Sequence, residues 1–389
     1  MHSFAHDFSG FDVVAFSTPS SMTYPLVRQS RFVSRYDQDT LVIAGGVHAS
    51  MYPAQTLLDL KVDALCVGEG DLTMREILER AHTRDFSKIP GICYPSSSGP
   101  VFTEPRKLLE DINDLPYPAR HLLPVDDLIM SNRLATTDLR MTHIMFSRGC
   151  PYSCYFCAAP QKKVQYRTGE NIRRELETLI AQYQISGFSI VDDNSIINKE
   201  NLSEICDSIT DLNLKWITVS RVDTITVQVL RAMKKAGCIE IAFGVESGSD
   251  AILAAMNKRI STKDIVDAIE LTHSMGIGVK VFLIHGFPGE NGQTTQQTID
   301  LLRIVADKIQ RISLFRFVPL PGSFVYRNHK QFDLHIDDDG DYSSVDWSRY
   351  HIHHNNYHWW GSQQDFATMN LAFNELRSFI QSKWPSRFE

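Results

Sequence analysis

The stretch HIMFSRGCPYSCYFC, residues 143–157, joins an apolar run typical of a buried strand to a loop with three cysteines. These cysteines, at positions 150, 154 and 157, belong to a chain that has seven in all. Disulfide pairing within the loop would leave one thiol over, because three is an odd number. We therefore expect reduced thiols that bind a metal centre, as is typical of a cytoplasmic protein.

A strand-and-helix rhythm begins at this stretch and continues to about residue 318. Five further apolar runs follow, each after a segment of helical spacing: FSIVDD, KWITVSR, IEIAFGVE, VKVFLIHG and ISLFRFVP. Units of about thirty residues with short loops favour right-handed βαβ crossovers. Six such strands predict a partial (β/α)6 barrel over residues 141–320, with an open doubly wound sheet as the structural alternative.

Polar side chains accompany every one of these strands. They are the cysteine loop, then Asp192, Asp193 and Asn194, then Ser220 and Arg221, then Glu246 and Ser247, then His285 and Gly286, and finally Arg316 within the last strand. In βα folds, ligands gather at the carboxyl ends of the strands, because the loops converge there. The pattern therefore predicts a binding site at this end of the barrel.

Three thiolates on one short loop can hold a cubane 4Fe–4S cluster by three of its irons and leave the fourth iron open. Zinc is the competing interpretation, but a structural zinc site usually takes four ligands, and no second cysteine hook follows at the usual distance. The other four cysteines, Cys66, Cys93, Cys206 and Cys238, stand singly in apolar or helical contexts. We expect those four to be small buried hydrophobic residues.

The C-x3-C-x2-C spacing, with Phe156 before the last cysteine, resembles the signature of the radical S-adenosylmethionine (SAM) enzymes. The resemblance continues through RVDTIT, MKKAGCIEIAFGVESGSDAILAAMNK and VFLIHGFPGE, so it covers residues 143–320. It implies a 4Fe–4S cluster whose open iron chelates SAM, and a 5′-deoxyadenosyl radical that abstracts hydrogen from a substrate. It also implies an electron donor such as flavodoxin or ferredoxin, and sensitivity to oxygen.

The resemblance further implies a role for each candidate site residue. The cluster ligands are matched by Cys150, Cys154 and Cys157. For SAM, Phe156 matches the aromatic beside the adenine, Glu246 with Ser247 matches the ribose contacts, and Arg221 matches the partner of the methionine carboxylate. Asp193 matches the contact to the SAM amino group, and the adenine-side wall is matched by His285, Gly286 and Arg316. Asp192, His354 and Tyr357 are the candidates for substrate contact. The alternative for the acidic pair 192–193 is a helix cap and a solvated loop.

Residues 1–90 contain three further apolar runs, DVVAFST, TLVIAGG and ALCVGEG, which predict three parallel strands with helices between them. This region resembles the second half of a flavodoxin-like cobalamin-binding domain, so we expect a truncated α/β layer. The ligand crevice of such a sheet lies beside its first strand, which this layer lacks, so cobalamin is disfavoured. The run DVVAFST becomes a sheet edge, which the barrel, the N-terminal arm or a second copy of the chain is expected to cover.

The remaining segments are less informative. Residues 91–140 predict a hairpin followed by an interdomain linker rich in proline. Residues 321–389 predict a C-terminal cap that ends in an amphipathic helix, with Leu371, Leu376 and Ile380 among its apolar positions. The histidines of the segment 351–358 are expected to line a surface or pocket rather than to bind metal.

The net charge of −7 argues against nucleic acid as a partner, and no apolar run is long enough to span a membrane. We therefore predict a cytoplasmic radical SAM enzyme that acts on a small polar metabolite without cobalamin, by elimination, rearrangement, epimerisation or dehydrogenation. The first alternative is a cobalamin-dependent radical SAM C-methyltransferase. A tRNA-modifying enzyme and a non-catalytic iron–sulfur protein are the weaker alternatives.

Overall fold

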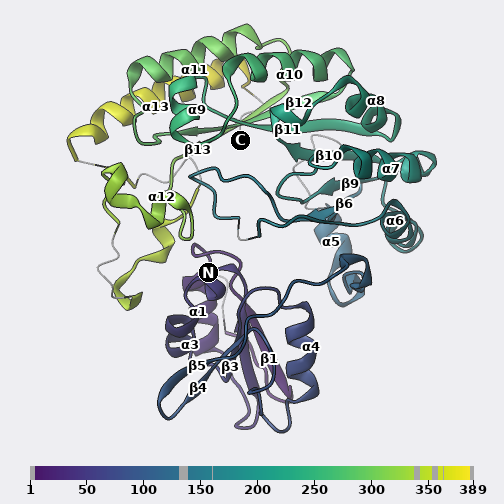
Figure 1. Cartoon of the computed structure of the whole chain (residues 1–389), viewed down its shortest axis with the longest axis vertical. Coiled ribbons are helices and arrows are strands. Elements are labelled where there is room, and N and C mark those ends of the chain that lie inside the picture. Colours follow the sequence, from purple (N-terminus) through teal and green to yellow (C-terminus); the bar gives the residue numbers. More distant parts are fainter. Residues whose placement is uncertain are drawn as a thin grey trace. The chain divides into compact units, whose positions relative to one another are not determined.

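The computed structural model describes residues 5–130, 139–159, 161–336, 342–352, 358–361 and 363–385. The chain divides into two compact units, labelled by element in Figure 1. The smaller unit comprises Met1–Glu110 with Val318–His351, and the larger comprises Asp111–Phe317 with Ile352–Glu389. Each unit thus combines segments that are far apart in the sequence.

The larger unit is built on a six-stranded sheet in which every neighbouring pair is parallel. Its strands are β6 (Met141–Ile144), β9 (Gly187–Ile190), β10 (Lys215–Ser220), β11 (Cys238–Glu246), β12 (Gly278–His285) and β13 (Arg311–Arg316). They pair strictly in chain order, and in the described residues the two outermost strands, β6 and β13, do not pair with each other. The predicted partial barrel is confirmed, because a doubly wound sheet would reverse its strand order at a switch point.

Helices cover the outer face of this curved sheet (Figure 1). They are α6 (Gly169–Tyr183), α7 (Lys199–Ile209), α8 (Val227–Lys235), α9 (Asp250–Ala255), α10 (Thr262–Ser274), α11 (Gly292–Ile304) and α13 (Gln363–Lys383). Side-chain caps begin five of the first six: Thr168, Asn198, Thr226, Ser261 and Asn291 each accept a hydrogen bond from a backbone N–H in the first turn. Such caps satisfy N–H groups that have no partner inside the helix.

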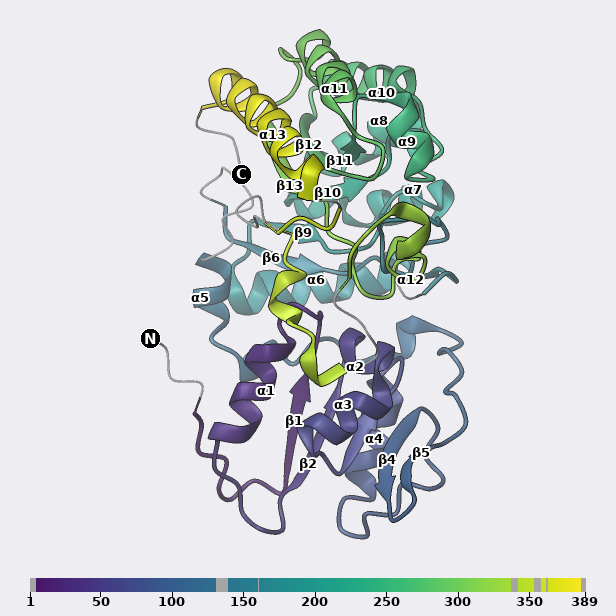
Figure 2. The same ribbon diagram turned by 90° about the vertical axis from the view of Figure 1, so that its left-hand side faces the viewer.

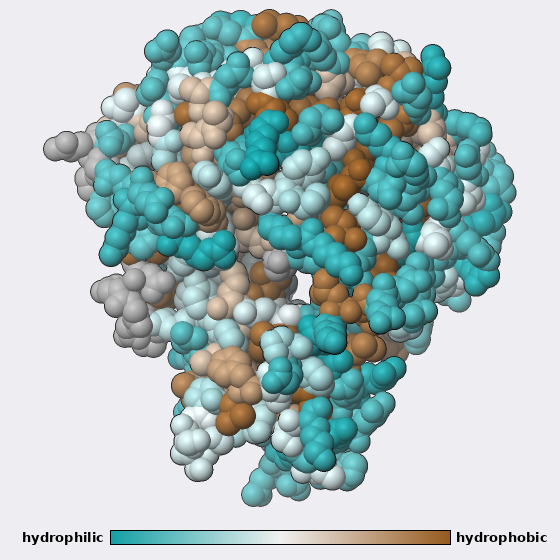
Figure 3. All heavy atoms as spheres, in the orientation of Figure 1, coloured by the Kyte–Doolittle hydropathy of each residue, from teal (hydrophilic) through white to brown (hydrophobic). Residues whose placement is uncertain are grey.

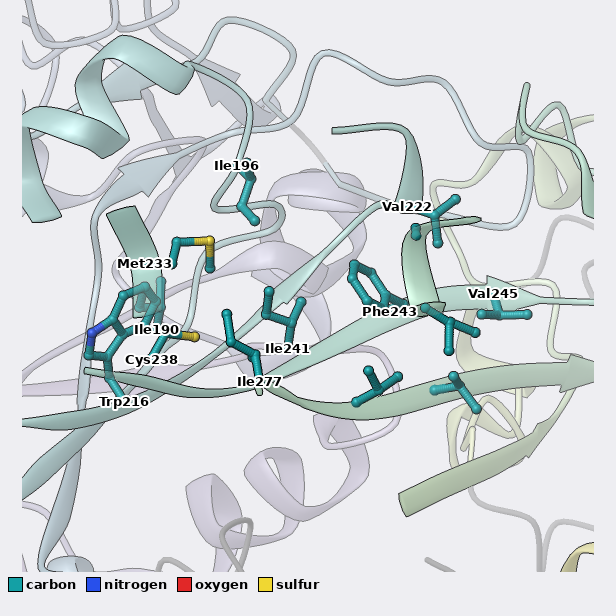
Figure 4. Close-up of a cluster of buried hydrophobic side chains, with 14 of the residues drawn as sticks. Ile190, Ile196, Trp216, Val222, Met233, Cys238, Ile241, Phe243, Val245 and Ile277 are labelled. Atoms are coloured by element: carbon teal, nitrogen blue, oxygen red, sulfur yellow. The ribbon is translucent and has the colours of Figure 1, made fainter. Parts of the chain in front are cut away.

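A continuous apolar core joins the sheet to these helices (Figure 4). Trp216 of β10 is fully buried and stacks on Phe188 of β9, with ring centroids 5.9 Å apart. The Trp216 indole N–H donates to the Ala236 carbonyl oxygen, so its polar group is satisfied inside the core. This packing makes the barrel wall a rigid support for the loops at the strand ends.

The closing helix α13 belongs to the same core through Phe373, Leu376 and Ile380, which are all buried. Leu371, predicted to lie on the apolar face, is instead 72% exposed. The buried positions 373, 376 and 380 follow helical spacing, and residue 371 falls on another side of that helix.

The smaller unit contains a five-stranded sheet in the order β1-β2-β3-β4-β5. The strands are β1 (Val13–Ser17), β2 (Leu41–Gly45), β3 (Ala64–Cys66), β4 (Ile92–Ser96) and β5 (Gly99–Phe102). The first three are parallel and the last two form an antiparallel hairpin, as the sequence predicts. Helices α1 (Tyr24–Val33) and α3 (Pro53–Leu60) lie on one face of the sheet and α4 (Asp71–Glu79) on the other (Figure 1).

Strand β1 forms an edge of this sheet, and no strand in the described residues pairs with its outer side. Phe8 of the N-terminal arm packs edge-on against Phe16, while Ala15 and Ser17 are exposed. The arm therefore covers part of the strand. Cover by a second copy of the chain stays a prediction.

The segment from residue 342 to residue 350 packs against the N-terminal strands and helices, within the smaller unit. It contains two short 3-10 turns, η6 (Tyr342–Ser344) and η7 (Trp347–Arg349), and Figure 2 shows it in yellow-green beside the ends of α1 and α2 (Val47–Met51). The predicted cap, residues 321–389, is thus divided between the two units at residue 351. His354 and Tyr357, the predicted substrate contacts in this region, lie outside the described residues.

Hydrophilic side chains predominate on the face shown in Figure 3. Among the described residues, no helix combines the length and the apolar character that crossing a membrane requires.

Candidate active site

The cysteine loop is closed at its base by a short antiparallel ladder between β7 (Ser147–Arg148) and β8 (Gln165–Tyr166). Within the loop, the Cys150 N–H donates to the Gln161 carbonyl oxygen. Gly149 has φ +102°, and a Cβ there would lie 2.6 Å from the Lys163 carbonyl oxygen. Only glycine fits this close approach without displacing the backbone, so the residue before the first cysteine shapes the loop.

The three cysteines of the loop form no disulfide. Burial raises the pKa of the Cys150 and Cys157 thiols, and the negative charges of Cys154 and Asp193 raise both further. These mutual effects place the three thiols and the exposed Asp193 carboxylate near one another. The Cys157 sulfur also accepts a hydrogen bond from the Ala159 N–H at 3.4 Å, a contact that favours the thiolate.

Arg221, at the end of β10, stands beside this loop with its guanidinium buried. One amino group lies 3.6 Å from the Cys154 sulfur, and the group stacks 3.9 Å from the centroid of the Tyr152 ring. Asp223 accepts two hydrogen bonds from Arg221, each at 2.8 Å. The structure therefore holds one charged edge of Arg221 toward the cluster ligands, where a carboxylate of SAM is expected.

Glu246, at the end of β11, is buried and adopts φ +64°, a conformation rare for a residue other than glycine. Its carboxylate accepts a hydrogen bond from the Lys258 ammonium at 2.8 Å. A strained backbone at a strand end is typical of functional sites. Lys258 also lies 5.6 Å from the centroid of the Phe156 ring, so this ion pair neighbours the cysteine loop, and the ribose contact of Glu246 stays a prediction.

Asp192 has a different environment from the one expected of a substrate contact. Its two carboxylate oxygens accept hydrogen bonds from the Phe146 N–H at 2.8 Å, the Ser147 N–H at 2.7 Å and the Ser147 hydroxyl at 2.6 Å. Burial raises the pKa of Asp192 to about 7, although these donors oppose the shift. The side chain is thus committed to the strand that leads into the cysteine loop, a support that sequence spacing does not reveal.

Three other predicted contacts have partners in the helix layer. The ring of His285 contacts the hydroxyl of Thr295 in α11 and the ring of Phe373 in α13, and Arg316 bonds Asn370 of α13. Ser247 is buried beside Thr298 of α11. The helix layer therefore contacts all three side chains.

The turn GFPGE at the end of β12 is held from within. The Gly286 N–H donates to the Glu290 carboxylate, and Gly286 has φ +95°. Burial raises the pKa of Glu290 to about 8, while bonds from the N–H groups of Gly286 and Phe287 act in the opposite direction. Glu290 therefore shapes the turn that was predicted to line the adenine side.

The segment MNK, residues 256–258, lies in the stretch that resembles the radical SAM enzymes, and the resemblance predicts no role for it. In the structure, Asn257 donates to the Ser153 carbonyl oxygen at 2.7 Å, and the Met256 carbonyl oxygen accepts the Tyr155 N–H. Nothing in the sequence spacing shows which loop these residues contact.

The residues present fit a 4Fe–4S cluster and SAM. Three undisulfided thiols on one loop supply the expected donor set. Asn194, at the end of β9, is 2% exposed, and its amide nitrogen has no hydrogen-bond partner in the part of the chain that the structure describes. A buried donor without a partner at a strand end is consistent with a ligand site.

The residues of the smaller unit do not fit cobalamin in the same way. Its ligand crevice would lie outside the carboxyl ends of β1 and β2. His48 is fully buried there and contacts the Ser21 hydroxyl at 2.9 Å and the Tyr342 hydroxyl at 2.7 Å. Tyr24 and Trp347 pack on the same imidazole, with ring centroids 4.2 and 4.8 Å away. Aromatic side chains of this unit therefore fill the position of the crevice.

Comparison with known proteins identifies the larger unit. The sequence profile of the radical SAM superfamily matches residues 144–302. An uncharacterized methyltransferase of Pyrococcus horikoshii, PH0819, is 29% identical over 296 residues, which are 74% of this chain and 63% of the relative. The anaerobic magnesium-protoporphyrin IX monomethyl ester cyclase of Rubrivivax gelatinosus is 26% identical over 75% of this chain and 54% of its own length. The chain thus spans less than two thirds of the length of these relatives.

Among solved structures, the radical SAM methyltransferase TsrM from Kitasatospora setae, with cobalamin and a 4Fe–4S cluster bound, superimposes with a TM-score of 0.65. It is 16% identical, and the match covers 80% of this chain and 63% of that one. At this identity the likeness concerns the fold. Together, the profile match and the cysteine loop show that residues 144–302 of this chain form a radical SAM domain.

Proposed function

We propose that this chain is the catalytic part of a radical SAM enzyme that transfers a methyl group to a carbon atom of a small molecule. The observation that carries the proposal is the loop of Cys150, Cys154 and Cys157 at the strand ends of the barrel, in a chain whose relatives include proteins named methyltransferases. When bound, the cluster and SAM supply the electron and the organic radical.

The chain's own residues would bind and orient these groups. The three cysteines hold the cluster, and Arg221 presents an amino group beside Cys154 for the carboxylate of SAM. Glu246 accepts the ribose hydroxyls, and the exposed Asp193 carboxylate lies near Cys150 for the amino group. Together, these residues would hold SAM at the cluster.

The relatives support methyl transfer better than the eliminations and rearrangements that the sequence favoured. Besides PH0819, they include a cytidylyl-2-hydroxyethylphosphonate methyltransferase of Streptomyces wedmorensis, 23% identical over 84% of this chain. The solved structure of TsrM contains cobalamin, which supports the cobalamin-dependent form of this reaction, the first alternative from the sequence.

A second candidate is hydrogen abstraction without cobalamin. The specific observation that favours it is the smaller unit, where His48, Tyr342 and Trp347 fill the carboxyl end of the sheet. In this candidate the deoxyadenosyl radical acts on the substrate with no methyl carrier.

The test uses the full chain, reconstituted without oxygen with iron and sulfide, then reduced and incubated with SAM, hydroxocobalamin and candidate metabolites. Methyl transfer predicts both 5′-deoxyadenosine and S-adenosylhomocysteine, with corrinoid retained after gel filtration in the cobalamin-dependent form. Formation of 5′-deoxyadenosine without S-adenosylhomocysteine and without retained corrinoid supports the second candidate. A cluster-loaded chain that yields neither nucleoside contradicts both.

A further inference from the structure

The loop that follows α9, residues 256–259, braces the cysteine loop at three points. The Met256 carbonyl oxygen accepts the Tyr155 N–H at 2.9 Å, and the Asn257 amide donates to the Ser153 carbonyl oxygen at 2.7 Å. The Lys258 ammonium lies over the Phe156 ring, 5.6 Å from its centroid. Three consecutive residues thus contact Ser153, Tyr155 and Phe156, which flank the middle cysteine. We call this segment the brace loop.

The brace loop is held in a conformation that its own backbone does not favour. Asn257 has φ +52° and Arg259 has φ +56°, both in the left-handed region. Each such residue costs about 1 kcal/mol or more and persists only where the surroundings hold it. The contacts to the cysteine loop are therefore part of what holds the brace loop in place.

Unlike a surface lysine, Lys258 has a buried ammonium group. It is 5% exposed, and its ammonium donates at 2.8 Å to the Glu246 carboxylate, which is also buried. Directly beneath this ion pair is Gly244, where a Cβ would lie 2.6 Å from the carboxylate oxygen and 2.8 Å from the lysine nitrogen. The absence of a side chain at 244 therefore makes room for the pair.

The same residue reaches the other predicted SAM contact through its backbone. The Lys258 carbonyl oxygen accepts a hydrogen bond from Arg221 at 2.6 Å, and Arg221 in turn points an amino group at the Cys154 sulfur. Lys258 is thus bonded to the candidate ribose residue by its side chain and to the candidate carboxylate residue by its backbone.

A buried ion pair is seldom retained for stability alone, because the cost of removing two charges from water offsets most of their attraction. Its position offers a reason for the charge. A carboxylate that accepts two ribose hydroxyls acts best when it is ionised and held in one orientation. An ammonium bonded to one of its oxygens favours both conditions.

We propose that Lys258 is a positioning residue for SAM. Its ammonium orients the Glu246 carboxylate toward the ribose. Through the brace loop, Lys258 also fixes the position of that carboxylate relative to the cysteine loop. The inference rests on the proposed function, because it takes SAM as the ligand of Glu246. It goes beyond it by assigning a role to a residue outside the cysteine signature and the strand ends.

The test compares Lys258→Met, which keeps the length of the side chain and removes its charge, with Lys258→Arg, which keeps the charge. Lys263→Met is the matched control, because Lys263 is an exposed lysine of α10 paired with Asp267. Each chain is reconstituted anaerobically, and three quantities are measured: iron and sulfide per chain, the dissociation constant of SAM by equilibrium dialysis, and the electron paramagnetic resonance spectrum of the reduced cluster with and without SAM.

The expected result is full cluster content in all variants, with SAM binding weakened about tenfold to a hundredfold in Lys258→Met, the scale of a lost charge-assisted hydrogen bond. The change that SAM causes in the spectrum of the reduced cluster should shrink in the same variant. Lys258→Arg should recover most of the affinity, and Lys263→Met should match the wild type. Binding by Lys258→Met within about twofold of wild type, with an unchanged spectrum, overturns the inference.

A double-mutant cycle covers the case in which Lys258→Met does not fold, since removing one partner leaves a buried charge uncompensated. Glu246→Gln combined with Lys258→Met removes both charges at once. If Lys258 acts through Glu246, the double variant binds SAM as weakly as Glu246→Gln alone. If the losses of SAM affinity in the two single variants multiply in the double variant, the inference is contradicted. A wild-type chain that holds its cluster but binds no SAM would contradict the proposed function instead.

Discussion

At the scale of single residues, the proposed chemistry depends on the three thiols of the cysteine loop as ligands of a metal centre. Burial raises the pKa of Cys150 and Cys157, so both favour the neutral thiol until a cluster supplies positive charge. Cys154, with Arg221 3.6 Å from its sulfur, links the cluster to the SAM side of the site. The cysteine signature alone predicted the ligands, but it contained no information about Arg221 as a neighbour of Cys154.

We predict that Cys154→Ser abolishes the cluster, because a cubane held by only two thiolates has lost a third of its protein ligands. Iron and sulfide per chain should fall to background, and 5′-deoxyadenosine formation should stop. Cys206→Ala is the control, since Cys206 is buried in the apolar core. Retention of a full cluster by Cys154→Ser would mean that the loop is not its site.

Gly244→Ala makes a second prediction at this scale. Its methyl group would approach the Glu246 carboxylate and the Lys258 ammonium within 3 Å, and both are ends of side chains that can move. The fold should therefore survive with full cluster content, while SAM affinity falls at least tenfold because the ion pair is displaced. Equilibrium dialysis measures the change. Unaltered affinity would show that the position of this ion pair does not matter for SAM.

At the scale of elements, apolar runs and helical spacing predicted all six barrel strands and the three parallel strands of the smaller sheet. The central runs of both sheets are largely buried, and burial on both faces produces the continuous apolar pattern that a sequence displays. The two-residue strands β7 and β8 were missed, because neither is long enough to show a period. The association of Tyr342 with His48 was also missed, since 294 residues separate the two and no periodicity encodes such a contact.

The start of α10 offers a prediction about one element. Ser261 and Asp264 form a capping box, in which the serine hydroxyl accepts the Asp264 N–H and the aspartate accepts the Ser261 N–H. Ser261→Ala should lower the free energy of unfolding by about 1 kcal/mol. Ser274→Ala, at the other end of the helix, should change it by less. Urea unfolding followed by circular dichroism measures both, and equal effects would argue against the cap.

At the scale of the whole molecule, His48 of the smaller unit and His285 of the larger unit are both buried. Burial lowers the pKa of His48 in the smaller unit and of His285 in the larger unit to about 3. Below pH 6.5 each of these imidazoles binds a proton in the unfolded chain but not in the folded chain. The stability that each histidine contributes is therefore present above pH 6.5 and is lost as the pH falls. The raised pKa values of Asp192 and Glu290 act in the opposite sense.

Because these effects overlap in the wild type, the test compares how the unfolding free energy of the wild type and of His285→Gln changes with pH. Glutamine keeps a polar partner for Thr295 and does not titrate. Between pH 7.5 and pH 5.5 the variant should lose about 1.4 kcal/mol less unfolding free energy than the wild type. Parallel losses in the two chains would contradict the assignment of His285 as a buried neutral group.

The two units differ in how completely the sequence predicted them. The barrel resembles its relatives throughout residues 143–320, so its fold, cluster ligands and ribose residue could be proposed in advance. The contacts of His285 and Arg316 could not, because a residue at a strand end points either to the site or to the helix layer, and one register position decides which. In the smaller unit, strand order was predictable, but the aromatic filling by Tyr342 and Trp347 depends on a distant segment.

The central claim is that this chain binds SAM at a three-cysteine 4Fe–4S cluster and cleaves it reductively. The most direct test is to quantify 5′-deoxyadenosine after the anaerobically reconstituted, reduced chain is incubated with SAM, beside the Cys154→Ser chain treated identically. We predict nucleoside in the first sample and only background in the second. A fully cluster-loaded and reduced wild-type chain that releases no more 5′-deoxyadenosine than the cysteine variant would contradict the claim.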